Sequence, residues 1–224
     1  MELGSLAGGL ISYLCFLIAL SFHEYAHGWM AYKCGDDTAK VMGRLTLNPA
    51  VHIDMLGTVI IPLVMLFLPL LTSGVSGFIV GWAKPVPVNP FNFRNRQRDD
   101  NLVSVAGPLS NLILAFVILC VIKLLSIFYG VGEGGNFLVG FQDFLLNLVY
   151  INIVLAWFNM IPVPPLDGSH LMKNLVGMSY ETYLRFSQYG IIILIILLNF
   201  TPLQQLLNKI IIYTYWVMCL ILRL

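Results

Sequence analysis

The sequence predicts an α-helical protein that passes through a membrane several times, with about six membrane-embedded helical segments. Of its 224 residues, 58% are hydrophobic and only 10% are charged, whereas a soluble domain usually contains about 25% charged residues. Long apolar runs recur along the chain, and its length accommodates about six spans of about 20 residues each with little left over. The formal net charge of +1 gives no reason to expect a nucleic-acid partner.

The apolar segments are separated by polar or proline-rich stretches. We expect helices at about 6–32, 56–71, 102–129, 137–160, 183–200 and 206–222. The first is expected to be a retained helix, because no basic residues precede it as they would in a signal peptide. Two stretches, 43–49 and 82–90, resemble short membrane-associated β-strands, and the alternate prolines Pro85 and Pro87 suit an edge strand.

Lysine and arginine residues in the short connections favour one orientation in the membrane. Residues 33–55 contain three of them, residues 73–101 contain four, and residues 130–136 contain none. We therefore expect both basic stretches on the cytoplasmic side and the N-terminus outside. This orientation requires the segment from Leu56 to Leu71 either to enter the membrane and return or to form a bent pair with residues 72–81. A plain six-span zigzag is the alternative.

The first apolar segment contains the pattern HExxH at residues 23–27. In a helix, positions i and i+4 lie on one face, so His23 and His27 can bind one zinc ion. Glu24 lies to the side, where it can polarise a zinc-bound water. Three ionisable groups on one turn of an apolar helix are energetically costly and generally mark a functional site. The sequence therefore predicts a metal site on this helix.

A zinc site of this kind requires at least one more protein ligand and a position left open for water. The candidates are His52, Asp54, Glu133, Asp143, Asp167 and His170. Asp167 is favoured because it follows the rigid stretch Pro162-Val163-Pro164-Pro165, and because a buried carboxylate there needs a cation.

Each of these candidates also has a structural interpretation. Asp167 could instead cap the helix that begins near Ser169. His52 and Asp54 could cap a helix or line the approach to the site, and His170 could face the interface instead of the metal. For Asn111 the two interpretations are a contact between helices in lipid and a contact with substrate.

Three motifs together resemble the site-2 protease family of intramembrane zinc metalloproteases: HExxH at 23–27, AGPLSN at 106–111 and NMIPVPPLDG at 159–168. The resemblance covers roughly residues 5–175 and is to the minimal branch, without PDZ or CBS domains. It implies one Zn²⁺ per chain, bound by His23, His27 and Asp167. It also implies that Glu24 is the catalytic acid/base and that Asn159 lies near the metal as a polar partner for substrate. We expect a single membrane-embedded metalloprotease domain over 1–224, with a catalytic core at about 5–175 and accessory helices at about 176–224.

Hydrolysis inside a membrane requires the substrate helix to be opened, and its freed backbone groups then need new partners. An edge strand next to the zinc would supply them by β-addition. Our hypothesis is that residues 83–89 form this clamp, alone or paired with residues 44–47. Val86 and Val88 are its candidate contact residues.

These features predict hydrolysis of peptide bonds in membrane-spanning or membrane-anchored proteins of a bacterial or archaeal plasma membrane. The expected partners are these substrates and the lipid bilayer. A metal-ion-handling membrane transporter is the alternative, but its acidic groups should be spread along several helices, often in a repeated half. Here they are concentrated in two motifs. A catalytically silent homologue would be expected to lack Glu24 or one of the ligands.

Overall fold

The computed structural model describes residues 3–64, 81–129 and 136–224. This part of the chain is helical. Its elements in order are α1 (Leu3–Cys34), α2 (Thr38–Val41), η1 (Pro49–Val51), η2 (Met55–Ile60), η3 (Pro90–Asn92), α4 (Arg96–Tyr129), α5 (Asn136–Asn159), α6 (Gly168–Leu175), α7 (Tyr180–Ser187), α8 (Gly190–Phe200) and α9 (Leu203–Leu222).

Four of these helices are long and apolar enough to cross a membrane, as expected of a multi-pass membrane protein. They are α1, α4, α5 and α9, and the pair α7–α8, bent by 59° at a short break, is a possible fifth span. The described residues thus contain four or five of the six predicted segments. Of the predicted segment 56–71, the structure describes a short apolar helix at Met55–Val64. The rest of that segment, and with it the choice between spanning and re-entry, lies outside the described residues.

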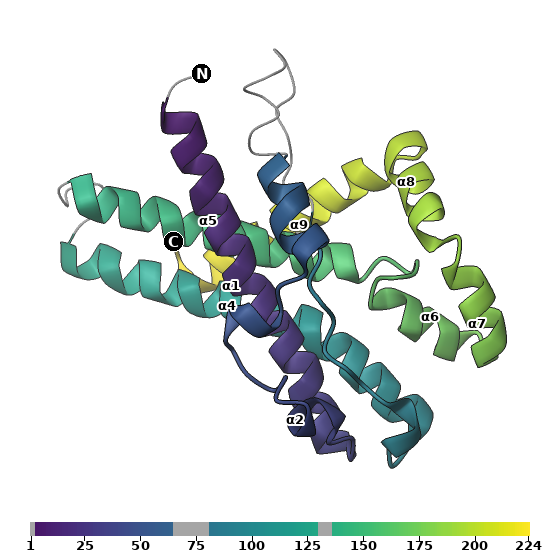
Figure 1. Cartoon of the computed structure of the whole chain (residues 1–224). Helices are drawn as coiled ribbons and strands as arrows, with labels where there is room; N and C mark the ends of the chain where they lie inside the picture. The colour runs from purple at the N-terminus through teal and green to yellow at the C-terminus, as the bar shows by residue number, and fades with distance from the viewer. Residues whose placement is uncertain (1–2, 65–80, 130–135) are drawn as a thin grey trace.

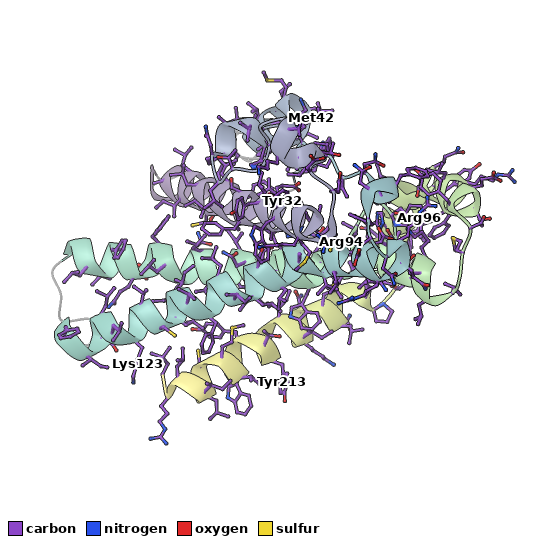
Figure 2. The ribbon with its side chains drawn as sticks, turned by 90° about the horizontal axis from the view of Figure 1, so that it is seen from below. Tyr32, Met42, Arg94, Arg96, Lys123 and Tyr213 are labelled. Atoms are coloured by element: carbon purple, nitrogen blue, oxygen red, sulfur yellow. The ribbon has the colours of Figure 1, made fainter. Side chains whose placement is uncertain are left out.

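The centre of the molecule is formed by α1, α4 and α5, which cross one another closely (Figure 1). Their shared core contains the fully buried side chains of Cys15, Leu119, Val149 and Ile153. Figure 2 shows α4 and α5 side by side with α9 along one side of the pair, and Tyr213 pointing away from them. This packing brings the first, second and third sequence motifs to one place, because each lies on or next to one of the three central helices.

The predicted strands at 43–49 and 82–90 are not found, since no residue in the described part of the chain is in a strand. Residues 81–89 are extended, but their backbone partners are mainly scattered groups from other segments. The guanidinium of Arg44 donates to the carbonyls of Lys84 and Pro85, and the Lys84 amide donates to the His52 carbonyl. The prolines explain the difference, because Pro85 and Pro87 have no N–H groups with which to build a ladder.

Candidate metal centre

The two histidines of the HExxH pattern lie one turn apart on α1 and are buried, with 4% and 9% of their surface exposed. Their Nε2 atoms are 3.0 Å apart. Asp167, directly before α6, faces both of them: its Oδ2 lies 3.1 Å from Nε2 of His23 and its Oδ1 3.3 Å from Nε2 of His27. The structure therefore brings together the three residues predicted as ligands.

Hydrogen bonds on the far side of each imidazole fix its protonation. Asn111 uses its amide nitrogen to donate to the Ala19 carbonyl and to Oδ1 of Asn152, so its oxygen must accept from Nδ1 of His23 at 2.6 Å. Nδ1 of His27 donates to the Val103 carbonyl at 2.8 Å. With Nδ1 protonated, a neutral imidazole presents a lone pair at Nε2. Two lone pairs and a carboxylate thus converge on one point, as the ligands of a bound cation do.

The distances between the three groups test whether zinc fits there. Zinc is bound tetrahedrally with ligand bonds of about 2.0–2.1 Å, which places neighbouring ligand atoms about 3.3 Å apart. The two Nε2 atoms are 3.0 Å apart, and each lies 3.1 or 3.3 Å from a different oxygen of the Asp167 carboxylate, which is close to this value. Oδ2 of Asp167 is also buried without a hydrogen-bond donor. The residues present therefore fit a zinc ion with a fourth position left for another ligand.

The alternative role of Asp167 as a helix cap is not the one its side chain adopts. Asp167 occupies the position before the first residue of α6, but its carboxylate makes no capping hydrogen bond. The carboxylate instead faces the Nε2 atoms of His23 and His27, as the side chain of a metal ligand would.

Gly107 of the second motif lies directly beside the two imidazoles. A Cβ atom built on Gly107 would overlap Nε2 of His27, and it would lie 2.6 Å from Cε1 of His27 and 2.7 Å from Cε1 of His23. Only glycine lets the backbone of α4 approach the site this closely. The glycine of this motif therefore permits the close approach of α4 to α1.

Glu24 is buried, and its carboxylate contacts the extended segment before η3. Its Oε2 accepts a hydrogen bond from the Val86 amide at 2.8 Å. The predicted clamp segment thus lies beside the active-site helix, but the Val86 amide is already engaged. The side chain of Val88 packs against the cluster of Ala31, Cys34, Phe93 and Val103. Substrate binding by these two residues stays a prediction.

The remaining predicted site residues have other partners. Asn111 is fully buried and uses its amide to join α1, α4 and α5, which fits the helix-contact interpretation. The amide nitrogen of Asn159 donates to the Leu155 carbonyl at the end of α5, and its predicted role toward substrate stays a prediction.

The other ligand candidates lie outside the metal centre. His52 bonds the Thr46 carbonyl, Asp54 caps η2 through the amides of Leu56 and Gly57, and His170 contacts Asp100. Asp143 is exposed on α5, and Glu133 lies outside the described residues. Sequence reasoning missed Asn152 and the Val103 carbonyl. An asparagine within an apolar helix indicates a buried polar partner, but does not identify it.

Comparisons with known proteins agree with this geometry. The profile of Peptidase family M50 matches residues 11–200. "Putative zinc metalloprotease YwhC" of Bacillus subtilis is 41% identical over 197 residues, which are 87% of this chain and 83% of that protein. "Putative zinc metalloprotease Rip2" of Mycolicibacterium smegmatis is 26% identical over 203 residues, 90% of this chain and 70% of that protein. No solved structure was found to match. The chain belongs to peptidase family M50, the site-2 protease family of zinc metalloproteases.

Proposed function

We propose that this chain is an intramembrane zinc metalloprotease that hydrolyses peptide bonds of membrane-spanning or membrane-anchored proteins. The observation that carries the proposal is the convergence of two Nε2 lone pairs and the Asp167 carboxylate beside the buried carboxylate of Glu24. This arrangement places a cation site, with two of its three ligands on α1, next to a proton acceptor on the same helix. The family membership and the names of its relatives support zinc as the cation.

The position of the site along α1 supports a reaction below the membrane surface. Trp29 lies under the ammonium group of Lys33 and Tyr32 under that of Lys40, and such aromatic–basic pairs are typical of the membrane interface. His23 precedes Trp29 by six residues, or about 9 Å of helix. The hydrocarbon core is about 30 Å thick. A site at this depth is accessible to a polypeptide held in the bilayer.

The chemistry that zinc supplies when bound is Lewis-acid polarisation of water and of a carbonyl group. His23, His27 and Asp167 would hold the ion, and their outer hydrogen bonds keep the two imidazoles oriented. Glu24 would accept the proton of the attacking water and pass it to the leaving amine. The Val86 amide holds the Glu24 carboxylate in place, and Asn159 is the proposed donor to the developing oxyanion.

The test compares the full chain with Glu24→Gln, a substitution that keeps the shape of the side chain and removes its ability to accept a proton. Glu24→Gln should retain one zinc per chain, measured by elemental analysis, and lose cleavage by about 10²–10⁴-fold. Cleavage is measured by proteomics of membrane-protein fragments in cells that express either chain. The double variant His27→Ala, Asp167→Ala should lose zinc.

Two results would contradict the proposal. Equal amounts of fragments from wild type and Glu24→Gln would show that Glu24 is not the base and would favour a metal-ion transporter. Stoichiometric zinc in the double variant would show that the cation lies elsewhere.

A further inference from the structure

A second buried carboxylate lies near the metal centre but takes no part in the mechanism above. Asp100, on the second turn of α4, is only 6% exposed. It accepts hydrogen bonds from Nζ of Lys173 at 2.6 Å and from the Asn174 amide at 2.7 Å, and Nδ1 of His170 lies 3.3 Å away. All three partners lie on α6, the short helix that begins directly after the ligand Asp167.

Neighbouring residues of α4 make further hydrogen bonds to α6. The Gln97 side chain donates to the Asn174 carbonyl, and the Asn174 amide also donates to Oδ1 of Asn101. Figure 2 shows the start of α4, marked by Arg96, lying against the helices of the α6–α7 region. A helix of eight residues has little stability of its own. Its position, and that of the residue before it, therefore depends on these contacts.

The same face of α4 also sets the two histidines. Asp100, Gly107 and Asn111 are spaced by seven and four residues, which places them within about 40° of one another around the helix. Asn111 orients His23, and the Val103 carbonyl, between Asp100 and Gly107, orients His27. One helix thus contacts both histidines directly and reaches the third ligand through α6.

We infer that Asp100 is a positioning residue for the metal centre: by holding α6 against α4, it places the Asp167 carboxylate at bonding distance from the ion that His23 and His27 bind. The inference rests on the proposed zinc site. It assigns a role in metal affinity to a residue that lies outside the three motifs.

The experiment uses the purified full chain and measures zinc affinity by competition with a chromophoric chelator. Asp100→Asn should lower zinc affinity by about 10–100-fold, the range found when the groups that orient metal ligands are removed. It should also change the visible spectrum of the Co²⁺-substituted protein, because the ligand geometry changes. Asp99→Asn is the matched control. Asp99 is equally buried, but its carboxylate accepts from the Asn95 amide at the start of α4 instead of contacting α6. The zinc affinity and the Co²⁺ spectrum of the Asp99→Asn protein should therefore be unchanged.

Two further variants separate positioning from simple charge balance. Asp100→Asn leaves the ammonium of Lys173 unpaired, and the double variant Asp100→Asn, Lys173→Gln removes that charge as well. The double variant should regain thermal stability and still bind zinc weakly. Asn174→Ala, which removes one donor without unpairing a charge, should lower zinc affinity by a smaller factor.

The outcomes are distinct. Wild-type zinc affinity in Asp100→Asn or in Asn174→Ala would overturn the inference and leave the zinc site standing. Full recovery of zinc affinity in the double variant would show that Asp100 only balances Lys173, which also overturns it. If neither the wild-type chain nor His27→Ala binds zinc, the proposed function fails, and this inference fails with it.

Discussion

The sharpest test of the site geometry is to add one methyl group at Gly107. A Cβ atom there would lie 2.7 Å or less from both imidazoles, whereas ordinary contacts begin at 3.4 Å. At the closest of these contacts the histidines or α4 must therefore move by about 1 Å, well beyond the tolerance of about 0.2 Å in metal–ligand distances. We expect Gly107→Ala to lower zinc affinity by about 100-fold or more, by analogy with the effect of a 1 Å misplacement in catalytic sites.

The assay is zinc competition in detergent, with circular dichroism to confirm that the helices are intact. Gly140→Ala is the matched control. Gly140 lies within α5 and a Cβ there meets no atom within 4 Å, so alanine should leave zinc binding unchanged and slightly favour the helix, by up to about 1 kcal/mol. If Gly107→Ala binds zinc as tightly as Gly140→Ala does, α4 does not approach the histidines as described, and the reasoning from close packing is refuted.

Three further predictions follow from other contacts. Asn111→Ala removes the acceptor that orients a ligand imidazole and should weaken zinc binding by about 10–100-fold in the same competition assay; an unchanged affinity would contradict the orienting role. Burial of Asp36 would raise its pKa, but hydrogen bonds from neighbouring groups outweigh burial and lower that pKa from 3.8. The ionised Asp36 should therefore stabilise the folded protein above about pH 4, and this stabilisation should be lost as the pH falls through the folded-state pKa. Thermal unfolding against pH should show this loss in wild type and in Asp37→Asn but not in Asp36→Asn, and equal curves for all three would contradict it. A photocrosslinker at Val86 should react with substrate trapped by the Glu24→Gln chain; reaction confined to the end of α5 would place the clamp elsewhere.

The parts of the site that follow from local periodicity could be predicted from the sequence. Two histidines four residues apart share a helix face whatever surrounds them, and an apolar run of about 20 residues is a span in almost any fold. The partner of His23 could not be predicted, because Asn111 is 88 residues away and several asparagines lie in apolar segments. Which polar groups meet is decided by helix packing, and spacing along one helix contains no information about it.

The strands predicted at 43–49 and 82–90 are not formed, because contacts with distant side chains determined the local structure there and the sequence pattern did not. Alternating valine and proline at 85–88 is typical of an edge strand, but an edge needs a neighbouring backbone to pair with. In the described structure side chains take that place: Arg44 covers two carbonyls, Glu24 accepts from the Val86 amide, and Asp36 accepts from the Asn89 amide. These partners are polar side chains from distant positions, which a period of two residues cannot indicate.

The same contacts explain how one turn of helix separates metal binding from proton transfer. His23 and His27 are about 40° apart around α1, whereas Glu24 is about 100° from His23. The imidazoles therefore face α4 and Asp167, and the carboxylate faces the extended segment at Val86. The Val86 amide thus fixes the direction of the Glu24 carboxylate, while Asn111 and the Val103 carbonyl fix the two imidazoles.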